Sequence, residues 1–133
     1  MSKPPAFLTV DQVLAIHRRM TAEFGGDPGV RDCGLLESAV SMPASRFGGE
    51  HLHAGLPEMA AAYLFHICRN HAFVDGNKRT SLAAAEMFLL LNGMRLVATD
   101  DELYALTAQV AACQVSKEIV TAFFREHVVP DRA

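Results

Sequence analysis

The sequence His-Ala-Phe-Val-Asp-Gly-Asn-Lys-Arg at residues 71–79 leads into an apolar segment, Leu82–Leu91. Asp-Gly-Asn is a turn-forming combination, and the apolar segment has the length of a helix, which we expect to begin near Asn77. Lys78 and Arg79 then lie in the first turn, where the helix dipole and the free N–H groups favour anions over cations. This arrangement indicates that an anion such as a phosphate group binds at the start of the helix.

Helical periodicity extends over most of the chain on both sides of this stretch. The predicted helices cover approximately residues 10–24, 32–41, 57–70, 77–91, 100–113 and 117–129. Residues 43–56 carry glycines and histidines and are predicted to form a loop, and Met94–Ala98 is an isolated extended segment that cannot form a sheet by itself. We therefore predict an all-α bundle of about six helices around the apolar helix 77–91, which we expect to be the most buried.

Three predicted helix starts carry residues that satisfy free backbone N–H groups. Thr9 with Gln12, and Thr99 with Glu102, have the spacing of capping boxes. Ser116 precedes the last helix and is a suitable N-cap residue. These local signals define where the helices begin.

Composition and length indicate a single folded domain, which we expect to span residues 1–133. Hydrophobic residues make up 50% of the 133 residues and charged residues 20%, which is enough apolar material for a core. The net charge is -3, so a broad basic face for nucleic acid is not expected.

The cysteines and the apolar segments indicate a cytoplasmic protein. Cys33, Cys68 and Cys113 are odd in number and form no CxxC pair, which favours buried thiols in a reducing compartment. The first residues show no secretory signal, and runs such as Met59–Cys68 are too short to cross a bilayer, so no membrane association is expected.

Two residues of the 71–79 stretch have side chains suited to acid–base and metal chemistry. His71 is a natural general base near neutral pH and can accept a proton from an attacking hydroxyl group. Asp75 can bind Mg²⁺, which usually uses one or two protein carboxylates together with phosphate oxygens. Phe73 lies between them and is expected to anchor the loop in the core while His71 faces outwards.

The remaining residues of the stretch are suited to phosphate binding. Gly76 permits a left-handed backbone and a close approach of phosphate to the chain. Asn77 can cap the helix or bind phosphate oxygens, and Lys78 and Arg79 offer a point charge and a planar fork for phosphates. A phosphoryl or nucleotidyl transfer needs a base, a metal ligand and neutralising charge together.

Each of these residues taken alone has a simpler interpretation as a turn, a solvated cation or a helix-end histidine. Their joint occurrence before an apolar helix favours function, although the spacing of a P-loop is absent. His51 and His53 are interpreted as mobile loop histidines, and His66 as a residue that packs within its helix. The segment Arg46–Gly49 is either a surface loop or a flap over the motif.

The stretch resembles the Fic family motif, H-P-F-x-[DE]-G-N-[GK]-R-x-x-R. Lys78 makes it similar to the death-on-curing (Doc) branch, the toxins of toxin–antitoxin pairs. Further segments fit the Doc pattern: Arg69-Asn70, Thr80, Phe88-Leu89, Asn92-Gly93, Ile16-His17, Gly25-Gly26 and Pro28-Gly29. The resemblance thus covers most of the chain and implies a Fic/Doc-like helical bundle.

The resemblance also implies a chemistry. It assigns His71 as the base, Asp75 as the Mg²⁺ ligand, and Asn77, Lys78 and Arg79 as contacts to the phosphates of a nucleotide. Typical Fic proteins transfer AMP to a protein hydroxyl group, whereas Doc-type proteins resemble kinases that use ATP to phosphorylate elongation factor Tu and arrest translation. Doc-type toxins are restrained by an antitoxin whose disordered tail folds onto the toxin.

Departures from the Fic pattern bear on the choice between these reactions. Lys78 replaces a glycine whose backbone helps to hold an anion in AMP-transferring members, and Leu82 replaces their final arginine. Both changes favour a Doc-like kinase, whereas Gly76 is Fic-like because the Doc pattern has alanine there. Ala72 replaces the usual proline and removes no chemical group. The alternatives are AMP transfer and a catalytically inactive regulatory protein that binds the antitoxin.

The self-inhibitory pattern [ST]-x-x-x-E-[GN] of many Fic proteins is absent, because no glutamate precedes a glycine or an asparagine. Any restraint on activity is therefore expected to come from another chain.

Overall fold

A computed structural model describes residues 3–132 and confirms the predicted mostly helical architecture. The described part contains six α-helices and a short 3₁₀ helix, Met42–Ala44. The α-helices are α1 Val10–Phe24, α2 Cys33–Ser41, α3 Leu56–Asn70, α4 Asn77–Leu91, α5 Asp100–Ala111 and α6 Lys117–His127. Residues 1, 2 and 133 of the predicted domain 1–133 lie outside the described residues, and its extent stays a prediction.

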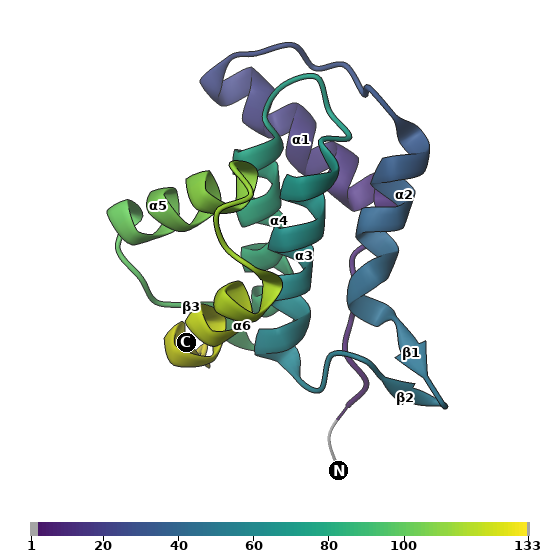
Figure 1. Cartoon of the computed structure of the whole chain (residues 1–133), viewed down its shortest axis with the longest axis vertical. Helices are drawn as coiled ribbons and strands as arrows, with labels where there is room; N and C mark the ends of the chain where they lie inside the picture. The colour runs from purple at the N-terminus through teal and green to yellow at the C-terminus, as the bar shows by residue number, and fades with distance from the viewer. Residues whose placement is uncertain (1–2, 133) are drawn as a thin grey trace.

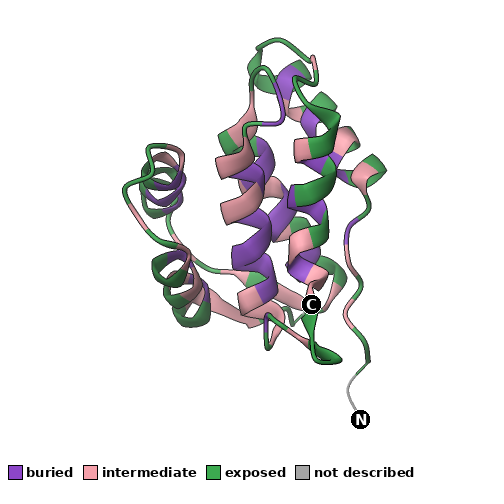
Figure 2. Cartoon of the chain, turned by 45° about the vertical axis from the view of Figure 1, so that its right-hand side comes forward, coloured by how far each residue is buried: buried purple, intermediate pink, exposed green. Residues whose placement is uncertain are grey.

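Helices α3 and α4 lie side by side in the centre of the molecule (Figure 1), and α3 is the more buried of the two. Ala60, Ala61 and Ala62 are fully buried on α3, and Ala84 and Ala85 on α4. Small side chains on both helices allow the two backbones to approach closely. The core therefore lies along the contact between these helices, as the buried residues in Figure 2 show.

The expectation that helix 77–91 is the most buried element is wrong. Leu90 is 55% exposed, Leu91 is 52% exposed and Met87 is 39% exposed, so one face of α4 remains in contact with solvent. The hydrophobic composition of a helix does not show which of its faces pack against other elements. Both helices are central, but the more amphipathic α3 is the more buried because it packs against α2, α4, α5 and α6.

Two short antiparallel strand pairs correct the sequence expectations. Within the predicted loop, β1 Arg46–Phe47 pairs with β2 Glu50–His51. The extended segment after α4 contains β3 Met94–Leu96, which pairs with β4 Val128–Pro130 and is therefore not isolated. The last helix was expected to continue to residue 129, before Pro130, but it ends at His127, because the β-branched residues that follow pair with β3 instead.

The predicted helix caps are confirmed. Thr9 and Gln12 form a capping box at α1, and the Ser116 hydroxyl caps α6. At α5, the Thr99 N–H donates to Glu102 at 2.9 Å, and the Glu102 N–H donates to the Thr99 hydroxyl at 3.1 Å.

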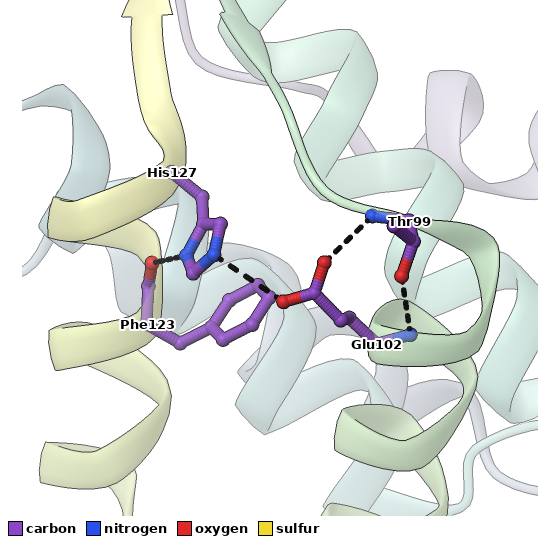
Figure 3. Close-up of polar contacts among 4 residues, drawn as sticks. All are labelled: Thr99, Glu102, Phe123 and His127. Carbon is purple, nitrogen blue, oxygen red and sulfur yellow. Dashed lines mark hydrogen bonds and ion pairs between the residues drawn. The ribbon is translucent and has the colours of Figure 1, made fainter.

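Glu102 also links α5 to the end of α6 (Figure 3). Its second carboxylate oxygen lies 3.6 Å from His127 Nε2, and His127 Nδ1 lies 2.7 Å from the Phe123 carbonyl oxygen. The hydrogen bonds from Thr99, with a smaller contribution from His127, hold the pKa of the Glu102 carboxyl below its usual value. The N-terminal end of α5 is therefore tied to the β3–β4 corner of the molecule.

No α-helix in the described range combines the length and the apolar character that a bilayer crossing requires. Of the three cysteines, Cys68 is buried as expected, whereas Cys33 and Cys113 are exposed.

Candidate active site

The loop between α3 and α4 places His71 in a strained backbone conformation. His71 follows α3 with φ 48° and ψ 46°, in the left-handed region, and its side chain is exposed. The next two residues, Ala72 and Phe73, are each 1% exposed and anchor the loop in the core, as predicted for Phe73. A left-handed conformation costs a non-glycine residue about 1–2 kcal/mol. Such strain persists only where the surroundings impose it, and it is frequent at functional sites.

The segment between α1 and α2 is the main support of this loop. The Arg31 N–H donates to the Ala72 carbonyl at 2.8 Å, and the Val74 N–H donates to the Gly29 carbonyl at 3.0 Å. Val30 and Phe73 form an antiparallel bridge between the two segments. The motif loop is therefore held by backbone hydrogen bonds to a segment about forty residues earlier in the chain.

The Arg31 side chain adds a second support at His71. Its Nε donates to the His71 carbonyl at 2.7 Å, and its Nη2 lies 3.3 Å from the Asn70 carbonyl. These carbonyls belong to the C-terminal end of α3, where a positive charge is favourable. Arg31 thereby stabilises the backbone that presents the His71 side chain to solvent.

Asp75 is tethered at two atoms. Its carboxylate Oδ2 accepts a hydrogen bond of 2.8 Å from the Asp27 N–H. Its backbone carbonyl lies 2.8 Å from His17 Nε2 on α1. Asp75 is exposed. The two contacts therefore fix the direction of its carboxylate while the carboxylate remains open to solvent.

Asn77 does not cap α4, which corrects one of the two roles expected for it. Gly76, with φ 81°, is the N-cap residue of α4, and Asn77 is the first helical residue. The Asn77 amide closes the loop on itself, since it accepts from the Phe73 N–H at 3.1 Å and donates to the Phe73 carbonyl at 2.9 Å. Its interaction with phosphate stays a prediction.

A cavity of about 670 Å³ lies next to the start of α4. Its lining residues come from the end of α1, from the motif, from α4 and from α5: Phe24, Gly76, Asn77, Lys78, Arg79, Leu82, Glu86, Asp100, Leu103, Tyr104 and Thr107. Its volume is that of a small-molecule site. The guanidinium of Arg79 lies over the Phe24 ring, 4.5 Å from its centroid, in a cation–π contact at the cavity wall.

Charges of both signs line this cavity. Lys78 and Arg79 lie in the first turn of α4, whereas Glu86 lies about two turns further along the same helix. Burial, and to a smaller extent the nearby Asp100 carboxylate, raises the pKa of the Glu86 carboxyl. The cavity can thus receive an anionic group near the start of α4 and hydrogen-bond donors near Glu86.

The structure brings four of the six predicted site residues, Gly76 to Arg79, together around the cavity. His71 and Asp75 belong to the adjoining loop and do not line it. Within residues 3–132, no group of three or more His, Cys, Asp or Glu side chains is placed to hold a metal ion.

Sequence reasoning missed His17, Asp27 and Arg31 as partners of the motif. The sequence signals for His17 were its position among the apolar residues of the predicted helix 10–24 and the Ile16-His17 segment of the resemblance.

Two other sequence interpretations change. His53 is only 7% exposed, so it is a packed side chain and not a mobile loop histidine. Burial, and secondarily Lys117, lowers its pKa. The hairpin that contains Arg46–Gly49 lies at the opposite end of α3 from the motif loop (Figure 1), which excludes a flap over the motif in this conformation.

Comparisons with known proteins identify the family of this chain. The model of the Fic/DOC family matches residues 7–89, which include the motif and its supporting segment. The chain is 50% identical over 78 residues to a protein of Mycolicibacterium smegmatis named Toxin Doc, an alignment that spans 59% of this chain and 60% of that relative. It is 33% identical over 118 residues to Protein kinase doc of Escherichia phage P1, spanning 89% of this chain and 92% of that relative.

Proposed function

This chain belongs to the Fic/DOC family, in its Doc branch, and we propose that it is a Doc-type toxin with protein kinase activity. The proposed reaction transfers the γ-phosphoryl group of ATP to a hydroxyl group of a target protein. The observation that supports it best is the cavity at the start of α4, which combines Lys78 and Arg79 with the apolar Leu82.

His71 is the proposed base. Its exposed side chain accepts the proton of the target hydroxyl, whose oxygen attacks the γ-phosphorus while ADP leaves. Arg31 contributes by holding the His71 carbonyl at 2.7 Å, which limits the movement of the histidine backbone. Lys78 and Arg79 neutralise the phosphates and favour their binding at the N-terminal end of α4.

Asp75 is the proposed Mg²⁺ ligand, and its surroundings fit that role. The backbone N–H of Asp27 donates a hydrogen bond to Oδ2 of Asp75, and the other oxygen of this exposed carboxylate is free to bind a cation. A site with one protein carboxylate is adequate for Mg²⁺, because phosphate oxygens and water complete its coordination. When bound, the ion supplies charge neutralisation on the transferring phosphoryl group.

AMP transfer is the alternative reaction. Leu82 lies in the cavity lining, where the AMP-transferring members carry an arginine, and this apolar residue offers nothing to the outer phosphates. Lys78 adds a side-chain charge where those members have a glycine. Both residues therefore favour phosphoryl transfer over AMP transfer.

The test is incubation of the protein with Mg²⁺, purified elongation factor Tu and ATP labelled at either the α or the γ position. Transfer of the γ label alone supports the kinase, and transfer of the α label overturns it in favour of AMP transfer. The His71→Ala variant is the control, because it removes the proposed base without touching the cavity. Elongation factor Tu is the proposed target. The same assay with a bacterial lysate instead of purified elongation factor Tu detects any other target protein.

An antitoxin is the proposed partner, as the name Toxin Doc of the mycobacterial relative implies for that protein. Its tail is proposed to be disordered alone and to fold on an exposed apolar surface of the toxin. Toxin, antitoxin and target are proposed to meet in the cytoplasm. A regulatory protein without catalysis remains the second candidate, and it is favoured if the His71→Ala variant is as toxic as the parent.

A further inference from the structure

One face of α1 contacts the motif at three successive places. His17, Thr21 and Phe24 are four and three residues apart and so lie on the same side of the helix. His17 contacts Phe73 and the Asp75 carbonyl, and Phe24 contacts Arg79. Between them, a Cβ atom placed on Gly76 would lie 3.5 Å from Thr21 Cγ2. This face of α1 therefore follows the motif from the loop into α4.

His17 makes the most specific contact of the three. It is 1% exposed, its ring stacks on Phe73 with a centroid distance of 3.7 Å and an interplanar angle of 9°, and its Nε2 lies 2.8 Å from the Asp75 carbonyl oxygen. A carbonyl oxygen can only accept a hydrogen bond, so His17 Nε2 must carry the proton. A buried side chain of this kind contributes both shape and one directed N–H group.

The two tethers of Asp75 act together. His17 holds the backbone carbonyl, and the Asp27 N–H holds carboxylate Oδ2 at 2.8 Å. With the backbone and one carboxylate oxygen both held, few rotamers remain for the side chain. The direction of the free oxygen is consequently set by α1 and by the segment that follows it, not by the motif itself.

We propose that His17 is a positioning residue, whose Nε2–H holds the Asp75 backbone so that the free carboxylate oxygen meets Mg²⁺. This inference rests on the proposed function for the role of Asp75, but the tether itself does not depend on catalysis. Because His17 is only 1% exposed, it acts through Asp75 and not directly on the substrate. A purely structural histidine would need its ring shape on Phe73 but not its hydrogen-bond donor.

Two substitutions separate these roles. His17→Phe keeps an aromatic ring over Phe73 and removes the donor, whereas His17→Gln keeps an N–H donor of similar reach and removes the ring. The first measurement is hydrogen exchange at the Asp27 amide, without nucleotide or metal. The second is the Mg²⁺ concentration that gives half-maximal transfer of the γ-phosphoryl group.

We expect the Asp27 amide to exchange roughly 2- to 12-fold faster in His17→Phe, as loss of one hydrogen bond implies. The half-maximal Mg²⁺ concentration should rise by a similar factor, with kcat at saturating Mg²⁺ close to that of the parent. His17→Gln should resemble the parent in both measurements.

Unchanged exchange and Mg²⁺ dependence in His17→Phe overturn the inference, as does a His17→Gln variant that behaves like His17→Phe. If His17→Phe does not fold, the exchange of His17→Gln decides alone: parent-like protection of the Asp27 amide supports the tether and its loss overturns it. A parent protein that transfers no label refutes the proposed function, while the exchange measurement still tests the tether.

Discussion

Replacement of Asn77 tests whether its amide closes the motif loop or binds phosphate. In the structure the amide accepts from the Phe73 N–H at 3.1 Å and donates to the Phe73 carbonyl at 2.9 Å. A typical hydrogen bond contributes about 0.5–1.5 kcal/mol net, so Asn77→Ala should lower the free energy of unfolding by about 1–3 kcal/mol. This loss should be present in protein without nucleotide.

Asn92 offers a matched control at the other end of the same helix. Its amide accepts from the Ala6 N–H at 2.8 Å and donates to the Ala6 carbonyl at 3.0 Å and to the Phe88 carbonyl at 2.7 Å. Asn92→Ala should therefore cost at least as much stability as Asn77→Ala and leave nucleotide affinity unchanged. Urea unfolding gives the stabilities by linear extrapolation, and calorimetry with an ATP analogue gives the affinities.

The loop-closing role is refuted if Asn77→Ala unfolds at the same urea concentration as the parent but binds nucleotide more weakly. That outcome would make Asn77 a phosphate ligand, as the family resemblance implies. Asn77→Asp adds a second check, because the new carboxylate would face the Phe73 carbonyl and repel it. The loss of stability in Asn77→Asp relative to the parent should shrink as the pH falls through the pKa of that carboxyl, because protonation removes the repulsion.

Three other perturbations have definite expectations. Phe24→Leu removes the ring that lies 4.5 Å from the Arg79 guanidinium, and the loss of about 0.5–1 kcal/mol should weaken nucleotide binding roughly 2- to 5-fold, measured by calorimetry; equal affinity would mean that the contact does not organise the cavity. Gly26→Ala places a Cβ atom 3.0 Å from Asp75 Cβ, at a position whose backbone φ is +111°. Both the melting temperature and the apparent Mg²⁺ affinity should therefore fall, because a side chain is strained at this φ and pushes against Asp75. An unchanged melting temperature would show that the substitution introduces no strain. Burial, the largest cause, lowers the pKa of His66 to about 4 from 6.5; the unfolded state then binds more protons between these values, so this contribution to stability is complete above about pH 6.5 and is lost towards pH 4. Urea unfolding at pH 7 and pH 5 should show a smaller loss of stability for His66→Leu than for the parent, by about 1 kcal/mol after allowance for partial exposure. Equal losses would indicate that the pKa of His66 is the same in the folded and the unfolded state.

Local signals in the sequence predicted most helix ends correctly. Thr9, Thr99 and Ser116 cap the helices that they were expected to cap, because a side chain that bonds a backbone N–H three residues away needs no tertiary partner. The apolar segment after the motif likewise forms α4 as expected, with Lys78 and Arg79 in its first turn.

Predictions that needed a distant partner failed. Met94–Leu96 is a strand only because Val128–Pro130 lies beside it, and helical periodicity gave no sign that the last helix ends at His127. His53 was interpreted as mobile because burial by other segments cannot be inferred from glycines nearby in the chain. In each case the outcome depends on contacts between residues far apart in sequence.

The same division applies to the candidate site. The sequence alone determined which chemical groups follow one another from His71 to Arg79 and that a helix begins among them, since both depend on neighbouring residues. Only the tertiary structure decided how these groups are held: His17, Asp27 and Arg31 reach the loop across 58, 48 and 40 residues of chain. Such contacts depend on how whole helices pack, and packing is set by the combined burial of many side chains rather than by any local pattern.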